Sequence, residues 1–280
     1  MASTSRAARP RSAHRGLRIL RGTLFGLLLL VVAALALVAG FYVGIARTMP
    51  ALQLIEDVST AQTTKIYDDS EEPVLLAELH GLENREVLDP SDIPRVLKDA
   101  TVAIEDERFY EHSGVDFFAI LRAVWANVTH GEIVQGGSTI TQQLIKNAFL
   151  TSEETVDRKL REAALAYQLE KQWSKDKILT EYLNIIYLGE GAYGVEAAAL
   201  TYFGVQAADL TLEQAALLAG LSQAPSAYSP RRNPEAAVGR RDIVLNKMYQ
   251  QGYITSVELQ DALATPLRLS ESKPTEEVLL

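Results

Sequence analysis

An uncharged, apolar run from Gly22 to Ala46 constrains the fold of this chain more than any other feature of its sequence. At a rise of about 1.5 Å per residue it would form a helix about 37 Å long, enough to cross a hydrocarbon core of about 30 Å. Only Arg47 follows the run closely, whereas six arginines precede it, namely Arg6, Arg9, Arg11, Arg15, Arg18 and Arg21. Because basic residues collect on the cytoplasmic side, we predict a cytoplasmic N-terminus and an extracytoplasmic remainder.

A cleaved signal peptide is the alternative for this run. Ala34-Leu35-Ala36 offers a cleavage pattern, but the apolar part of a signal peptide is usually about 7–15 residues long, shorter than the run observed. We therefore predict a single-pass protein of the inner or plasma membrane with four parts. These are a cytoplasmic Arg-rich tail (1–21), a transmembrane anchor (22–46), an extracytoplasmic domain (47–265) and a polar tail or truncated linker (266–280).

The chain beyond the anchor is strongly acidic. Seven of the 27 lysines and arginines are the arginines up to and including Arg47. The rest of the chain therefore has 20 basic residues against 36 acidic residues. Such a balance gives no general attraction to nucleic acid or anionic lipid, so an anionic substrate must meet a local basic site. The sequence contains no cysteine, which excludes disulfides, thiolate nucleophiles and zinc sites built on cysteine.

Local signals predict a mostly α domain with one small β-hairpin. Thr63 to Tyr67 alternates in polarity, ends at a turn-like Asp68-Asp69-Ser70, and is followed by Val74 to Leu79, so we expect a hairpin and no other sheet. From Ser91 onward the signals are helical, beginning with Pro94 in the first turn of a helix. Later helix starts and ends are indicated by Thr151 with Glu154, Thr255 with Glu258, Asn233-Pro234, Gly189, Gly204 and Gly252.

Three polar clusters are candidates for chemistry. The first follows an apolar run and contains Glu105-Asp106-Glu107, then His112. A carboxylate at the end of a buried helix is partly desolvated and suited to taking a proton near neutral pH. A solvated acidic turn is the alternative. His112 has no second histidine at helical spacing, so no metal site is predicted there.

The second cluster is Val134 to Asn147, "VQGGSTITQQLIKN". Its glycines let backbone amides approach a ligand, and its hydroxyls suit phosphate or sugar oxygens. It does not match a phosphate-binding P-loop, because no glycine directly precedes Lys146. The alternative is a turn with an N-cap, in which Gln142 and Gln143 are solvated.

The third cluster lies in a strongly helical segment, Asp157 to Trp173. Arg158 and Lys159 stand four and three residues before Glu162, so two cations flank one carboxylate. Ordinary surface ion pairing is the alternative interpretation.

Five stretches occur in the order of the motifs of one family. They read EDERFYEHSG from Glu105, GGSTITQQLIKN from Gly136, RKLRE from Arg158, KILTEYLNIIYLG from Lys177 and LTLEQAALLAGLSQAPSAYSP from Leu210. Together they resemble the peptidoglycan glycosyltransferase domain of class A penicillin-binding proteins and of monofunctional transglycosylases. The resemblance covers about Thr63 to Met248.

The resemblance implies a lysozyme-like α fold at the outer face of the membrane that polymerises lipid II. The donor would be the growing glycan on undecaprenyl pyrophosphate, and the acceptor the 4-hydroxyl of an incoming lipid II. A single inverting displacement would convert the α-linked donor into a β-1,4 glycan. The implied partners are lipid II, the nascent glycan chain, the lipid bilayer and cell-wall synthesis proteins.

The resemblance also implies roles for individual residues. Glu105 would be the general base, and Glu162 the second glutamate, near the leaving group. The cations around the diphosphate would be Lys146, Arg158 and Lys159. Further substrate-binding positions would be Asp106, Ser138, Thr139, Thr141, Gln142, Gln143 and Asn147. Motif positions expected to pack or to hold the site are Phe109, His112, Gly114, Gly137, Tyr182 and Asn184.

The resemblance requires no cofactor, and it leaves open a divalent cation, Mg²⁺ or Mn²⁺, for which the sequence has no dedicated ligand cage. The apolar segment from Phe117 to Trp125 would dip into the bilayer, with core packing as the alternative. No transpeptidase is predicted, since Ser270-Glu-Ser-Lys273 matches a penicillin-binding motif by letters only and no Lys-Thr-Gly is present. The chain would be monofunctional or cut from a bifunctional protein. Rival functions are a lysozyme-like glycan hydrolase and an inactive scaffold of the wall-synthesis complex.

Overall fold

The structure is a computed structural model that describes residues 21–26, 28–29, 32–33, 40, 64–67, 75–79, 84–85, 87–130, 137–149 and 156–271. The chain divides into two compact units, Met1–Pro50 and Ala51–Leu280. In the first unit the described residues are helical, and most of the predicted transmembrane anchor, 22–46, lies outside them. Within the described ranges, no helix combines the length and the apolar character needed to span a membrane.

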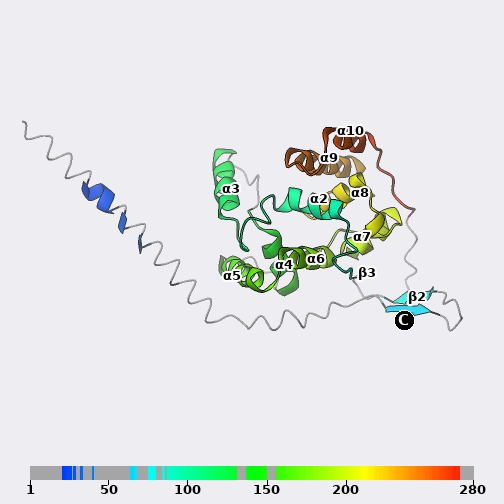
Figure 1. Cartoon of the computed structure of the whole chain (residues 1–280), viewed down its shortest axis with the longest axis horizontal. Coiled ribbons are helices and arrows are strands. Elements are labelled where there is room, and N and C mark those ends of the chain that lie inside the picture. Colours follow the sequence, from blue (N-terminus) through cyan, green and yellow to red (C-terminus); the bar gives the residue numbers. More distant parts are fainter. Residues whose placement is uncertain are drawn as a thin grey trace, which may run out of the picture. The chain divides into compact units, whose positions relative to one another are not determined.

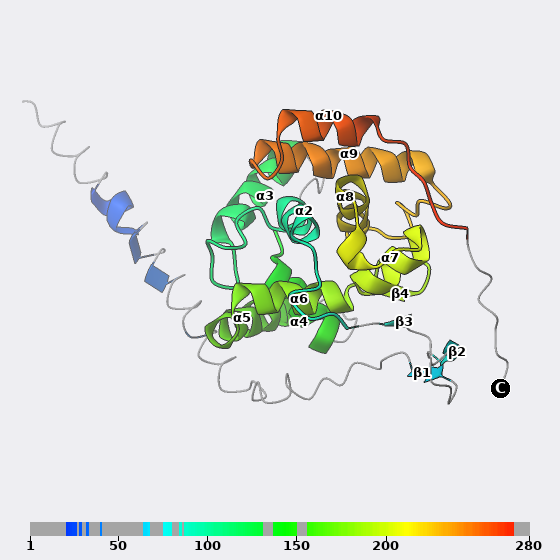
Figure 2. The same ribbon diagram turned by 45° about the vertical axis from the view of Figure 1, so that its right-hand side comes forward.

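The second unit is mostly helical, as predicted (Figures 1 and 2). Its longer helices are α2 (Arg95–Glu105), α3 (Phe117–His130), α4 (Ile140–Phe149), α5 (Val156–Gln172), α6 (Lys175–Ile185), α7 (Val195–Phe203), α8 (Leu212–Leu221), α9 (Pro234–Gln250) and α10 (Ser256–Ala264). A short 3-10 helix, η2 (Ala207–Asp209), precedes α8.

Strands are few and short. The predicted hairpin is confirmed, because β1 (Thr64–Tyr67) pairs antiparallel with β2 (Leu75–Leu79). The expectation that it would be the only sheet is wrong. β3 (Asn84–Arg85) pairs in parallel with β4 (Ala192–Tyr193), joining segments that are more than 100 residues apart. Each of these two strands has only two residues, too few to show an alternating pattern in the sequence.

Helix α2 lies between two groups of buried side chains. Its Leu97 and Val102 belong to the larger core, which includes residues of α4, α6, α7 and α8, among them the fully buried Tyr182. Its Ala100 and Ala103 face a second core built with α8, α9 and α10. Both views show α2 with α6 on one side and α9 on the other (Figures 1 and 2). Burial on two sides fixes α2 firmly, and its C-terminal end carries Glu105.

Several predicted helix boundaries are present. Thr255 and Glu258 form the capping box that begins α10, and Gly204 ends α7 in the left-handed conformation. Pro234 is the first residue of α9, after Asn233. Gly189 is a wrong prediction as a helix end, because α6 already ends at Ile185. The pair of Thr151 and Glu154 lies outside the described residues.

Candidate active site

Glu105 is the last residue of α2, and both oxygens of its half-buried carboxylate have hydrogen-bond partners. The side-chain amide of Gln143, on α4, donates to Oε2 at 2.7 Å. The hydroxyl of Ser222, just beyond α8, lies 2.5 Å from Oε1. Three segments distant in sequence therefore meet at this carboxylate. This arrangement differs from the solvated acidic turn that was the alternative.

Tyr182 of α6 orients Gln143, because its hydroxyl donates to Gln143 Oε1 at 3.1 Å. Burial, and after it the negative charge of Glu105, raises the pKa of Tyr182 well above its ordinary value. The phenol therefore keeps its proton and acts as a donor at neutral pH. With its oxygen accepting from Tyr182, Gln143 must turn its NH₂ group toward Glu105.

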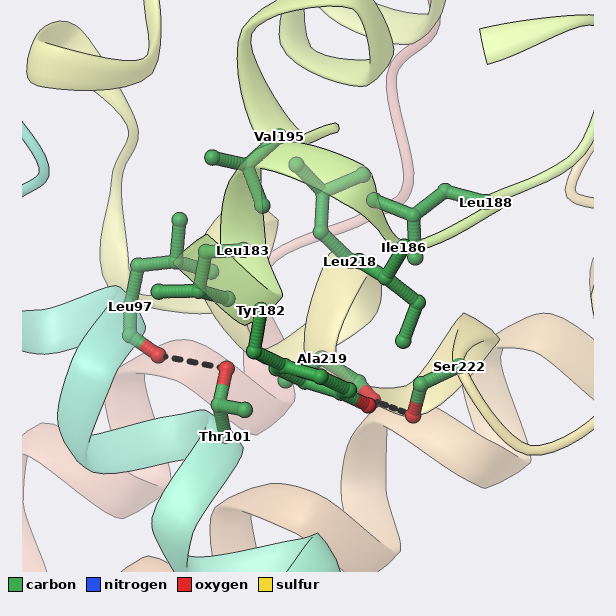
Figure 3. Close-up of a pocket in the computed structure, with 10 residues that line it drawn as sticks. All are labelled: Leu97, Thr101, Tyr182, Leu183, Ile186, Leu188, Val195, Leu218, Ala219 and Ser222. Carbon is green, nitrogen blue, oxygen red and sulfur yellow. Dashed lines mark hydrogen bonds between the residues drawn. The ribbon is translucent and has the colours of Figure 1, made fainter. Parts of the chain in front are cut away.

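A small cavity of about 10 Å³ lies on the inner side of this cluster, and Tyr182 and Ser222 are among its lining residues (Figure 3). Its other walls are largely aliphatic, including Leu97, Leu183 and Leu218. The cluster around Glu105 is thus backed by apolar core.

Asp106, the next residue, is buried and its carboxylate is used within the protein. His112 Nε2 lies 3.0 and 2.9 Å from its two oxygens, and the backbone amide of Ile140 donates to Oδ2 at 3.1 Å. Asp106 therefore ties the end of α2 to the start of α4. Glu170 lies near the other ring nitrogen of His112, with its Oε1 4.0 Å from His112 Nδ1. Its Oε2 forms a salt bridge with Lys175 Nζ at 2.7 Å. Sequence inspection missed Glu170, which stands outside the five motif stretches.

The polar residues just before α4 and within it divide into two groups. Thr139 and Gln142 form a reciprocal capping box, with Thr139 N donating to Gln142 Oε1 at 3.0 Å and Gln142 N to Thr139 Oγ1 at 3.1 Å. Thr141 is buried and donates to Glu170 at 2.5 Å. The N-cap part of the turn-with-N-cap alternative is thus confirmed for Thr139, but Gln142 is buried and Gln143 half-buried, not solvated as that alternative stated. Their predicted contacts with substrate, and that of Thr141, stay predictions.

The other group faces outward. Ser138 is half-buried, and Lys146 and Asn147 have exposed side chains toward the end of α4. Each can reach a ligand without rearrangement of the core.

Glu162, on α5, is fully buried, yet it pairs with a half-exposed lysine. Lys159 Nζ lies 2.7 Å from Glu162 Oε1 and donates to Ser138 Oγ at 3.1 Å. Arg158 is also buried. Since one partner is inaccessible to solvent, this is not the ordinary surface ion pairing of the alternative interpretation.

The two predicted carboxylates are attached to one short segment. Gln143 holds Glu105, and Ser138 contacts the lysine that holds Glu162. Gln143 stands five positions after Ser138, a distance on the order of 10 Å along the start of a helix. One substrate spanning sugar and diphosphate could therefore contact both.

The expected packing positions are tightly enclosed. Phe109 is fully buried beneath Lys175, whose Nζ lies 4.5 Å from the ring centre. The side chain of Asn184 accepts a hydrogen bond from Leu88 N and donates one to Leu88 O, both at 3.0 Å. A side chain at Gly137 would meet Ile120 Cα at 3.3 Å, a tight approach between the two backbone segments.

Helix α3 carries an apolar surface, defined here by Phe117, Phe118, Leu121 and Trp125, each between 67% and 73% exposed. For these four side chains the core-packing alternative is wrong. Asp116, before α3, accepts from Ala119 N and from Arg108, whose guanidinium also lies over the Phe118 ring. Burial works against the charge of Asp116, but these hydrogen bonds outweigh it and hold its pKa below the usual range.

The predicted divalent cation has no evident set of ligands. Among the described residues, no three histidine or acidic side chains lie close enough together to hold a metal ion. The cation stays a prediction, and the chemistry below uses none.

A family model described as Transglycosylase matches residues 72–249. Penicillin-binding protein 1A of Aquifex aeolicus is 44% identical, over 88% of this chain and 34% of its own length, and that of Streptococcus oralis is 42% identical, over 90% and 39%. A crystal structure of penicillin-binding protein 1A from Haemophilus influenzae aligns with a TM-score of 0.45 at 27% identity, covering 77% of this chain and 22% of that one. The chain spans about a third of the length of these curated relatives. The chain belongs to the transglycosylase family.

Proposed function

We propose that this chain is a membrane-anchored peptidoglycan glycosyltransferase with a lysozyme-like catalytic domain. It would polymerise lipid II into β-1,4 glycan strands and release undecaprenyl pyrophosphate. The observation that carries the proposal is the joint attachment of Glu105 and of the Lys159–Glu162 pair to residues 138–143. A carboxylate and a cation thus each contact one short segment, so a sugar diphosphate lying along it could reach both.

Glu105 is the general base. Its carboxylate takes the proton of the acceptor 4-hydroxyl as that oxygen attacks the anomeric carbon of the donor. The bond from this carbon to the diphosphate oxygen breaks, and its electron pair leaves with the diphosphate. One displacement at one carbon inverts the configuration, from α to β. Gln143 and Ser222 use one position on each carboxylate oxygen, and a carboxylate offers about four, so the acceptor can still approach.

Lys159 stabilises the departing diphosphate. An ammonium group has three hydrogens, and in this structure two of them are directed to Glu162 and Ser138. The third remains for a phosphate oxygen, and the two contacts hold the group in place for it. Lys146 and Arg158 add charge on the same anion, where it develops in the transition state.

The proposed location is the outer face of the inner or plasma membrane. The run 22–46 would anchor the chain, and the apolar surface of α3 would enter the lipid, since four large apolar side chains are exposed there. The substrate would then arrive along the membrane, which suits a domain whose overall charge is negative. Nascent glycan and cell-wall synthesis proteins are the expected partners.

Polymerisation of fluorescent lipid II by the full chain in detergent tests the proposal. Long glycan with release of undecaprenyl pyrophosphate supports it, shortening of added glycan supports the hydrolase, and no reaction supports the scaffold. Glu105→Gln should lower the rate by about 100-fold or more, because the amide cannot accept the proton. The matched control is Glu107→Gln, which changes an exposed carboxylate two residues away and should leave the rate unchanged. Full polymer from the Glu105 variant would remove the assignment of the base.

A further inference from the structure

Ser222 lies within hydrogen-bond distance of two acceptors at once. Its Oγ is 2.5 Å from Glu105 Oε1 and 2.7 Å from the carbonyl oxygen of Ala219, and Figure 3 shows the second contact. A hydroxyl group has one hydrogen, so it donates to only one of these acceptors at a time. The phenol of Tyr182 also interacts with the Ser222 hydroxyl, but its own hydrogen is directed to Gln143. Among Ser222, Glu105 and Ala219 there are therefore two arrangements that differ only in hydrogen positions.

The first arrangement fits an ionised Glu105. The carboxylate can only accept, so the hydroxyl of Ser222 donates to it. The second fits Glu105 after it has taken a proton on Oε1. The new O–H then donates to Ser222 Oγ, and the hydrogen of Ser222 turns to the carbonyl of Ala219. Glu105 and Ser222 keep a hydrogen bond to each other in both arrangements, and no heavy atom has to move.

The hydrogen bond from Gln143 to Glu105 Oε2 cannot reverse its direction in this way. The amide nitrogen of Gln143 is a donor only, and the phenol of Tyr182 fixes which end of the amide faces Glu105. Oε2 is thus held as an acceptor, which leaves Oε1, beside Ser222, as the oxygen that can carry a proton.

We propose that Ser222 is a positioning residue whose hydroxyl reverses its hydrogen bond as Glu105 gains and loses the proton. This deepens the proposed function and rests on it, since the proton is the one taken from the acceptor. A donor to the ionised carboxylate keeps it ready as a base, and an acceptor for the protonated form keeps it in place after transfer.

The surrounding charges do not supply this effect. The titratable group that faces Glu105 from α6 is the phenol of Tyr182, which stays neutral. From α9, Arg240 donates to Gly220 O, near Ser222, and not to Glu105 in the described contacts. The chain neighbours Asp106 and Glu107 are an internally bonded and an exposed carboxylate, and neither is within reach of Ser222 in the described contacts.

The test compares the pH dependence of lipid II polymerisation in three variants. In Ser222→Ala both forms of Glu105 lose a hydrogen bond, but the bond to the ionised carboxylate is the stronger one, so the acidic limb of kcat/KM should move to higher pH by about one unit. The rate near the limb should fall about tenfold, with recovery at higher pH and an unchanged KM. Ser222→Thr, which keeps the hydroxyl, should restore the original profile. Ser229→Ala is the matched control, because Ser229 donates to another carboxylate, that of Glu190, at 3.1 Å.

A profile of Ser222→Ala that superimposes on the unchanged protein, or that falls by one factor at every pH, would overturn the proposal. If the unchanged protein makes no polymer, the proposed function fails instead. The hydrogen-bond exchange is then tested without turnover, by recording the ¹³C NMR signal of the Glu105 carboxyl carbon as the pH is varied. The signal is assigned by its absence in Glu105→Gln. The same response to pH with and without the Ser222 hydroxyl would again refute it.

Discussion

Replacement of Gly114 by alanine should destabilise the domain strongly. Gly114 has a φ of +83°, and a left-handed conformation costs a residue with a Cβ about 1–2 kcal/mol. The added Cβ would also meet the backbone of α5, at 2.6 Å from both Ala166 C and Tyr167 N. Backbone atoms cannot move aside as a flexible side chain does, and such overpacking costs about 1–3 kcal/mol more.

The sum, about 2–5 kcal/mol, corresponds to a fall in the unfolding temperature on the order of 10 °C for a domain of this size. It should be measured by circular dichroism during heating. Gly252→Ala is the matched control, since Gly252 has a similar φ of +78° but no atom within 4 Å of a new Cβ. It should show the conformational cost alone, about 1–2 kcal/mol.

Equal losses in the two variants would refute the reasoning, because the close approach to α5 would then have no energetic consequence. The site should respond as well, since the carbonyl of Gly114 accepts from Thr139 Oγ1 at 2.7 Å. A shift of Gly114 would therefore disturb the start of α4 and, through it, both carboxylate contacts.

Two further predictions concern charge. Asp116→Asn should reduce the loss of stability in acid, as urea unfolding at several pH values would show. Because the pKa of Asp116 is lowered in the folded protein, largely by Arg108, its ionised carboxylate stabilises the fold. This contribution is complete above about pH 3.9 and is lost as the pH falls through the lower pKa of the folded state. An unchanged acid dependence would contradict this. Lys146→Ala should weaken donor binding and turnover and lower kcat/KM for lipid II by roughly tenfold. The control Lys171→Ala removes an exposed lysine stacked on Tyr167 and should leave kcat/KM unchanged. Equal effects of the two variants would show that only net charge matters.

The parts of this fold that sequence inspection predicted are those set by local signals. The β1–β2 hairpin follows from alternation and a turn, and the start of α10 from Thr255 and Glu258. The β3–β4 pair and the meeting of Ser222 with Glu105 depend on chain folding over 100 residues or more, which no local pattern records. The capping role of Thr139 and Gln142 was within reach, since the Thr-x-x-Gln spacing is a known helix start.

The same limit applies to the polar clusters, whose composition does not reveal burial. Asp106 and Glu105 are adjacent in sequence, yet Asp106 is enclosed by His112 and the start of α4, while Glu105 is half-buried beside two neutral donors. The turn at the end of α2 separates them, because Asp106 leaves the helical conformation. Sequence spacing identified the acidic cluster but could not divide its members between structure and chemistry.

Glu105 and Glu162 also differ in what a proton would disrupt, and this difference supports their separate roles. Glu162 is fully buried and paired with the ammonium of Lys159, so protonation would remove the partner that holds that charge. Glu105 is held by the neutral groups of Gln143 and Ser222, so protonation breaks no ion pair. If the hydroxyl of Ser222 reverses, it breaks no hydrogen bond either. A base must gain and lose a proton in every cycle, whereas the partner of a cation at a leaving group must stay charged throughout. The surroundings of Glu105 suit the first task, and those of Glu162 the second.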